Sequence, residues 1–173
     1  MYVRRPPGHA ASVAPVALSV EPASVAAARR LVRDALAGQQ TQSIGDAALL
    51  VSELVTNAIR YARRTLLVAV ELQDHVVRVE VTDDDPELPS LSVAEDDDAT
   101  SGRGLRIVND LADQWGVTEG PNGKTVWFEI HLQPPGAEHV RPYDQDGSRS
   151  RREPLLGRSQ GASRRPPPSA TWD

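Results

Sequence analysis

The sequence has no cysteine, so neither a disulfide framework nor a cysteine-ligated zinc site can stabilise this chain of 173 residues. Lysine is nearly absent too, since Lys124 is the only one among 19 basic residues. No apolar run approaches the roughly 20 residues that a membrane-spanning helix requires. The N-terminal arginines are not followed by an apolar stretch long enough for a signal peptide. We therefore expect a cytoplasmic protein without membrane contact.

Positive charge is scarce in the middle of the chain. Residues 17–132 carry 10 basic and 19 acidic side chains, and the stretch 83–98 alone holds eight acids and no base. A protein that binds nucleic acid through its folded part needs a basic face for the phosphates. The charge balance therefore argues against direct nucleic-acid binding, and leaves as an alternative only contacts made by the C-terminal arginines.

Proline marks the two ends of the chain. Half of the 14 prolines lie in residues 134–173, together with arginine, glycine and serine. A segment of this composition buries too little apolar surface to offset the entropy of ordering it. We therefore predict a flexible arm over 1–16, one folded domain over 17–132, and a disordered tail over 133–173.

Apolar periodicity predicts the helices and strands of this domain, because a repeat of 3.6 residues indicates a helix and alternation indicates a strand. In chain order we expect a strand at 17–20, helices at 24–37 and 43–62, strands at 65–72 and 75–82 joined by a Gln73-Asp74 turn, a loop at 83–102, a helix at 104–112, and strands at 115–119 and 124–132 joined by an Asn122-Gly123 turn. The helices are too few for a doubly wound parallel sheet. The order favours an α/β (α+β) two-layer sandwich, with helices on one face of a mixed, mostly antiparallel sheet.

One face of the predicted helix at 43–62 carries three polar side chains. At about 100° per residue, Glu53, Asn57 and Arg60 point in nearly the same direction. A carboxylate, a carboxamide and a guanidinium would then lie within reach of one another. The same pattern is typical of the solvated side of an amphipathic helix, so both interpretations stay open.

Two further patterns flank the long loop. Gly102 and Gly104 begin the helix after it, where backbone N–H groups and the helix dipole favour an anion. Asp83 ends the strand before it, where a carboxylate can accept a hydrogen bond from an exocyclic amine. A flexible hinge explains the glycines equally well, and an ordinary turn residue explains the aspartate.

Together and in this order, these patterns resemble the Bergerat-fold ATPases, a superfamily that includes gyrase B, histidine kinases and MutL-type proteins. The resemblance is carried by LLVSELVTNAIRYA, VEVTDDDPELP, SGRGLRIVNDLADQWGV and GKTVWFEI. Within the superfamily, these segments look most like the anti-sigma-factor serine/threonine kinases and their actinobacterial relatives. The resemblance covers 17–132 and implies a histidine-kinase-like ATPase domain.

The resemblance also implies roles for the matching residues. Glu53 would be the general base, and Asn57 would coordinate the Mg²⁺ that bridges the ATP phosphates. Asp83 would bind the adenine amine with the assistance of Thr125, and 84–101 would form the ATP lid. Arg60 and Lys124 would contact the phosphates, and the backbone of Gly102, Arg103, Gly104 and Leu105 would wrap them.

The activity that the resemblance implies is ATP-dependent phosphoryl transfer in a partner-switching system. Such a kinase binds and blocks a sigma factor, and it phosphorylates a serine or threonine on an anti-sigma-factor antagonist, which is then released. Relatives of this kind often form homodimers. The alternative is a nucleotide-binding interaction module without catalysis. Two differences from relatives stand out: Asp85 occupies a position where they usually have glycine, and 95–98 of the lid are all acidic.

Overall fold

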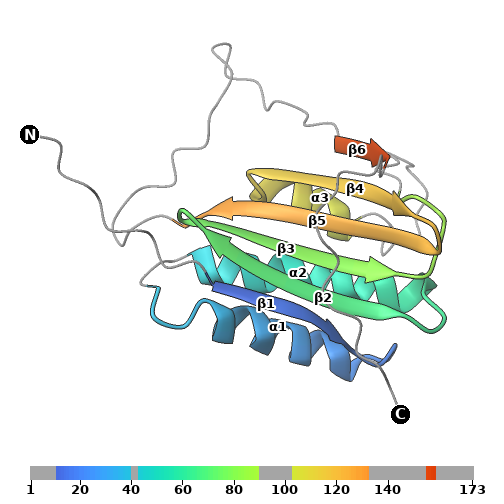
Figure 1. Ribbon diagram of the computed structural model, residues 1–173, viewed down its shortest axis with the longest axis horizontal. Helices are drawn as coiled ribbons and strands as arrows, with labels where there is room; N and C mark the ends of the chain where they lie inside the picture. The colour runs from blue at the N-terminus through green and yellow to red at the C-terminus, as the bar shows by residue number, and fades with distance from the viewer. Residues whose placement is uncertain (1–10, 40–42, 90–102, 133–154, 159–173) are drawn as a thin grey trace, which may run out of the picture.

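A computed structural model describes residues 11–39, 43–89, 103–132 and 155–158. It shows a six-stranded sheet with strand order β1-β2-β3-β5-β4-β6, covered by helices on one face (Figure 1). The elements are β1 (Ala11–Ala17), α1 (Ala23–Ala35), α2 (Ser43–Tyr61), β2 (Leu66–Gln73), β3 (Val76–Asp83), α3 (Arg103–Leu111), β4 (Gln114–Gly120), β5 (Gly123–His131) and β6 (Leu155–Arg158). The predicted two-layer α+β fold is confirmed. Within the described ranges, no helix is long and apolar enough to cross a membrane.

Neighbouring strands are antiparallel, except that β4 and β6 run parallel. β2 and β3 form the predicted hairpin, in which Gln73 pairs with Val76 around a turn of Asp74 and His75. Both turn residues have positive φ, of 49° and 66°, as a type I′ turn requires at its two central positions. The turn therefore lies one residue further along the chain than the sequence predicts.

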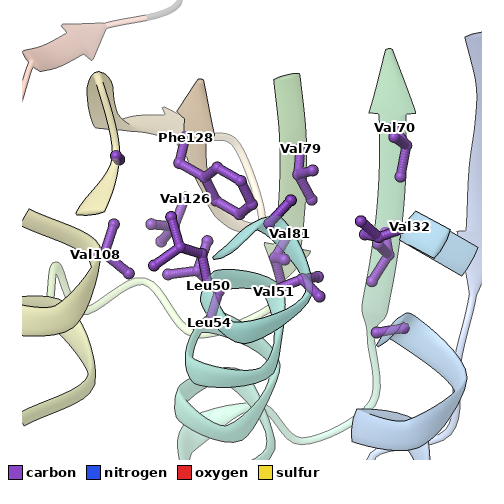
Figure 2. Packing of buried hydrophobic residues seen from close by; sticks show 14 of the residues in the cluster. Val32, Leu50, Val51, Leu54, Val70, Val79, Val81, Val108, Val126 and Phe128 are labelled. Carbon is purple, nitrogen blue, oxygen red and sulfur yellow. The ribbon is translucent and has the colours of Figure 1, made fainter. Parts of the chain in front are cut away.

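The core lies between the sheet and the helices, because alternating side chains of each strand point to one face. On the α2 side it contains Leu50, Val51, Leu54, Val79, Val81, Val126 and Phe128, all at most 3% exposed (Figure 2). Odd-numbered residues of β3 and even-numbered residues of β5 thus face the helices. The same alternation decides which side chains at the adjoining ends of β3 and β5 lie on the helix side of the sheet.

The first strand begins earlier than the sequence predicts. β1 covers Ala11–Ala17 and not 17–20, so it includes part of the predicted flexible arm. Val13 packs against the core. Pro15 is accommodated because it has no N–H to donate and lies on an edge strand, where the register with β2 shifts between Val13 and Val16. Proline at such a position is compatible with a strand. The predicted arm over 1–16 therefore extended too far, and the predicted start of the strand was wrong.

The predicted disordered tail contains a strand. β6 pairs with β4, from Gly116 opposite Leu155 to Glu119 opposite Arg158. Gly116 permits this approach, because a Cβ atom there would lie 2.5 Å from the carbonyl oxygen of Leu155. Backbone pairing holds these four residues, and composition does not register such pairing, so the prediction of disorder is corrected at β6. The remainder of the predicted tail lies outside the described residues.

Candidate functional site

The polar face of α2 meets the beginning of α3. Glu53 and Asn57 are both half-buried, and neither side chain has a hydrogen bond or ion pair with any part of the chain that the structure describes. Gly104 lies directly against Glu53, because a Cβ atom on this glycine would be 2.9 Å from Oε2 of the glutamate. A carboxylate beside the N-terminus of α3 and a carboxamide one helical turn away thus have no partner among the described residues.

The other predicted phosphate contacts fall in different places. Arg103 is the first residue of α3. The side chain of Leu105 is only 5% exposed and belongs to the core, so its backbone alone could meet a ligand. Arg60 is exposed in the last turn of α2. Gly102 and the larger part of the predicted lid, 90–101, lie outside the described residues.

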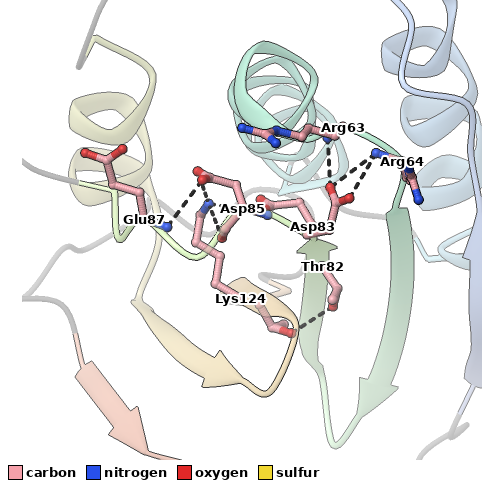
Figure 3. Close-up of polar contacts among 9 residues, drawn as sticks. Arg63, Arg64, Thr82, Asp83, Asp85, Glu87 and Lys124 are labelled. Atoms are coloured by element: carbon pink, nitrogen blue, oxygen red, sulfur yellow. Dashed lines mark hydrogen bonds and ion pairs between the residues drawn. The ribbon is translucent and has the colours of Figure 1, made fainter.

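A buried ion pair joins the end of β3 to the beginning of β5. Asp83 and Lys124 are opposite each other in the register, and each side chain is 2% exposed. Lys124 Nζ donates to Asp83 Oδ1 at 2.9 Å, to Asp85 Oδ2 at 2.8 Å and to the Asp85 carbonyl oxygen at 3.0 Å (Figure 3). An ammonium group has three protons to donate, and these three acceptors engage them. The phosphate contact expected of Lys124 is thus replaced by contacts with two aspartates.

The two aspartates respond to Lys124 differently. Burial raises the pKa of Asp83 above its ordinary value of 3.8, and the hydrogen bond from Lys124 is the largest influence that opposes this rise. For Asp85, which is nearer the solvent, the hydrogen bond from Lys124 outweighs burial and lowers the pKa. Lys124 is therefore the main counterweight to the burial of the Asp83 carboxylate.

Gly123 allows the strands to approach closely enough for this ion pair. Its φ is 147°, a conformation that residues with a side chain rarely adopt. A Cβ atom at this position would overlap the carbonyl oxygen of Asp83 and lie 2.8 Å from Cα of Asp84. The predicted hairpin is present, with Pro121 and Asn122 between the paired Gly120 and Gly123. The glycine therefore serves the contact between β3 and β5 as well as the turn.

Thr125 lies on the opposite face of the sheet from Asp83. It is paired with Thr82, and the Oγ1 atoms of the two threonines are 2.8 Å apart. Because successive side chains of a strand point to opposite faces, Thr125 cannot share the face of Lys124. The structure thus corrects the expected assistance of Thr125 at the adenine contact, since the residue placed beside Asp83 is Lys124.

Asp84 has a structural role that the sequence did not indicate. Its carboxylate accepts hydrogen bonds from the backbone N–H of Arg63 at 2.8 Å and of Arg64 at 3.0 Å (Figure 3). The chain just after α2 is thereby fastened to the end of β3. These bonds, the one from Arg63 first, lower the pKa of Asp84 below 3.8. The only sequence signal is the general tendency of aspartate to bind backbone N–H groups near turns.

We expect the contribution of Asp84 to stability to depend on pH. A carboxyl group whose pKa is lower in the folded than in the unfolded chain stabilises the fold above its ordinary pKa, and this is lost as the pH falls through the folded value. Asp84→Asn should therefore lower the free energy of unfolding at about pH 7 and change it little at about pH 2. Urea denaturation of both proteins at each pH measures this, and an equal difference at the two pH values would contradict it.

Residues 18–130 match the model of the histidine kinase-like ATPase domain. The match covers more than half of the chain and includes every candidate site residue discussed above. The chain belongs to the histidine kinase-like ATPase family. Its mixed sheet with helices on one face is the Bergerat-type arrangement of that family, and an ATPase domain of this kind implies ATP binding.

Two solved structures are similar to this chain. The crystal structure of the RsbU and RsbW domains of Rv1364c from Mycobacterium tuberculosis matches 70% of this chain with a TM-score of 0.53 and 22% identity. This chain spans about a third of that one, 32%. The histidine kinase domain of the Erythrobacter litoralis EL346 blue-light activated histidine kinase matches 66% of this chain and 62% of its own, with a TM-score of 0.43 and 23% identity. No curated protein matches in sequence. At such identities the first similarity shows the fold alone.

Proposed function

We propose that the protein binds ATP with Mg²⁺ between α2, the beginning of α3 and the Asp83 end of β3, and that it phosphorylates a serine or threonine of a partner protein. The observation that carries this proposal is the pair Glu53 and Asn57, one helical turn apart, which has no partner among the described residues, with Glu53 lying against Gly104. Asp83 stands at the end of the neighbouring strand. The hydrogen bonds from the backbone N–H groups of Arg63 and Arg64 to Asp84 join the end of α2 to the end of β3, two parts of the proposed site.

The available side chains fit a magnesium nucleotide. Mg²⁺ prefers oxygen ligands and is commonly held by few protein groups together with substrate phosphates. The described residues include no group of three metal-ligating side chains, so Asn57 would hold the ion jointly with the phosphates. When bound, the ion would neutralise charge that develops on the phosphates during transfer.

Glu53 would act as the general base of the transfer. The partner's hydroxyl oxygen attacks the γ-phosphorus while Glu53 accepts the hydroxyl proton. The bond from the γ-phosphorus to the bridging oxygen breaks, and ADP leaves. Phosphoryl transfer depends mainly on positioning and charge neutralisation. The absence of a side chain at Gly104 supports this role, because a Cβ atom there would crowd the Glu53 carboxylate at the beginning of α3.

The partner we propose is an anti-sigma-factor antagonist, and the regulated protein is a sigma factor in the cytoplasm. The family membership and the RsbW domain among similar structures support this assignment. Phosphorylation of the antagonist would release it and leave the sigma factor bound. We also propose a homodimer, because relatives that the sequence resembles often form one.

Mg-ATP is expected to stabilise the wild-type protein, and Asn57→Ala is expected to abolish this effect. A ligand at 100 times its Kd adds about 2.7 kcal/mol to the stability of a folded protein. Differential scanning fluorimetry with and without millimolar Mg-ATP measures the shift in Tm. Thr56→Ala changes the exposed neighbour of Asn57 on α2 and should retain the wild-type shift. No shift in the wild type would overturn the proposed ATP site.

Glu53→Ala is expected to separate binding from catalysis. It should retain the thermal shift, because Glu53 is not proposed as a nucleotide ligand. It should reduce phosphoryl transfer to an antagonist by about 100-fold or more, the usual contribution of a general base. Transfer of label from γ-³²P-ATP to candidate antagonists measures this. Binding without transfer in the wild type would favour the alternative, a nucleotide-dependent interaction module.

A further inference from the structure

The Asp83 carboxylate presents its two oxygens unequally. Oδ1 accepts two hydrogen bonds, from Lys124 Nζ at 2.9 Å and from the backbone N–H of Asp85 at 3.0 Å. Oδ2 accepts none from the residues that the structure describes. Among the described residues, every fully buried side-chain oxygen has a hydrogen-bond partner. Because Oδ2 has no such partner, this atom is not fully buried. One oxygen is therefore fixed by the protein, and the other can meet a donor.

Lys124 also controls the side chain of Asp85. Its ammonium binds both the carboxylate and the carbonyl oxygen of Asp85, so this residue is held at two points (Figure 3). Asp85 N–H binds Asp83 Oδ1 in turn. The Asp85 carboxylate is thus paired with the Lys124 ammonium. In this position Asp85 does not compete with Asp83 for a donor, and the ammonium offsets the repulsion between Asp85 and a negatively charged ligand.

The charge of Lys124 decides what Asp83 can bind. An ionised carboxylate accepts hydrogen bonds only, whereas a protonated one also donates. A carboxyl group that is 2% exposed and has no cation beside it favours the neutral form. With the lysine in place, Oδ2 is an acceptor and suits an amine. Without it, the carboxyl group would also suit a carbonyl oxygen.

We propose that Lys124 is a specificity-determining positioning residue, which fixes Asp83 Oδ1, draws Asp85 aside, and so leaves Oδ2 to accept a hydrogen bond from the exocyclic amine of a purine nucleotide. This inference rests on the proposed nucleotide site. It assigns selection of a 6-amino over a 6-oxo purine to a residue that makes no contact with the base itself. The ion pair supplies the selection, and Asp83 alone does not.

Three nucleotides test the inference by base chemistry. ATP has the 6-amino group, purine riboside triphosphate lacks it, and inosine triphosphate has a 6-oxo group in its place. Isothermal titration with Mg²⁺ should show that the wild type binds ATP at least about 10-fold more tightly than either analogue, as expected for a hydrogen bond to a charged acceptor. In Lys124→Met the preference over purine riboside triphosphate should fall below about 3-fold, and inosine triphosphate should gain relative to ATP.

The controls distinguish selection from general damage. Arg78→Met removes an arginine that binds Glu80 and Glu129 on the opposite face of the sheet from Lys124, and it should keep the wild-type preference. Lys124→Gln keeps a donor without the charge, and it serves in the same assay if the methionine variant does not fold. If either lysine variant keeps the wild-type preference, or the wild type shows none, the inference is overturned while the ATP site stands. If the wild type binds none of the three nucleotides, the proposed function itself fails.

A measurement on the wild type alone is also decisive, because Lys124 is the only lysine in the sequence. Labelling lysine with ¹⁵N at Nζ gives a single side-chain resonance from within the site. Saturating ATP should shift this resonance more than saturating purine riboside triphosphate, since only ATP places a donor on the carboxylate that the ammonium binds. Equal shifts with the two nucleotides would overturn the inference without any substitution.

Discussion

Lys124→Met is expected to lower the free energy of unfolding by about 3–5 kcal/mol, the usual effect of removing one partner from a buried ion pair. The substitution keeps most of the side-chain volume, but it leaves the Asp83 carboxylate buried without its main compensating charge. Urea denaturation at neutral pH measures the loss. The loss should shrink on acidification, because a protonated Asp83 no longer requires a cation.

Two further variants show whether the uncompensated charge is the cause. Asp83→Asn added to Lys124→Met should recover a large part of the lost stability. Arg78→Met removes an arginine that binds Glu80 and Glu129 on the face of the sheet opposite the described helices, where its side chain is 28% exposed. Its loss should be smaller, about 1–2 kcal/mol, because its ion pairs are partly exposed and its position 3.9 Å above the Trp127 ring adds a modest cation–π contribution. Equal losses for the arginine and lysine variants would contradict the interpretation.

Gly123→Ala is expected to destabilise the domain by about 2–5 kcal/mol, from backbone strain together with overpacking. The added Cβ atom would overlap the Asp83 carbonyl oxygen, and backbone cannot move aside as a flexible side chain can. Separating β3 from β5 would also pull Lys124 away from Asp83. The variant should therefore lose the thermal shift with Mg-ATP as well as stability, and denaturation and fluorimetry measure the two effects.

Gly120 provides the matched control in the same hairpin. It is paired with Gly123, and a Cβ atom on it would meet only the carbonyl oxygen of Gly123 at 3.5 Å, an ordinary contact. Gly120→Ala should therefore change stability by less than about 1 kcal/mol. If both alanine variants lose the same stability, the turn in general, and not the contact at Asp83, would be the sensitive feature.

Local patterns were sufficient to predict the helices and strands within the domain. The 3.6-residue repeat predicted α2 with its polar face, and alternation predicted the β2–β3 and β4–β5 hairpins, each within one or two residues of the observed bounds. The glycine at the beginning of α3 was also found in advance. What composition missed was β6 and most of β1, because pairing with an edge depends on the neighbouring strand and not on the segment's own content.

Local sequence patterns did not predict which residues the site residues contact. The resemblance implied a phosphate contact for Lys124 and assistance of Thr125 at Asp83. The register between β3 and β5 reverses this, placing Lys124 against Asp83 and Thr125 against Thr82 on the other face. A one-residue step changes the face of a strand residue, and no pattern within either strand fixes how the two align.

The sequence by itself determined an α+β fold with Glu53 and Asn57 on one helix and Asp83 at the end of a strand, because periodicity and order along the chain are local. Its motifs carried the resemblance to the histidine kinase-like ATPase family, and the match over 18–130 confirms the family. Only the tertiary structure decided that Gly104 lies against Glu53 and that Lys124 binds Asp83 and Asp85. Contacts between residues 41 positions apart depend on strand register and close backbone approach, and these are properties of the assembled sheet.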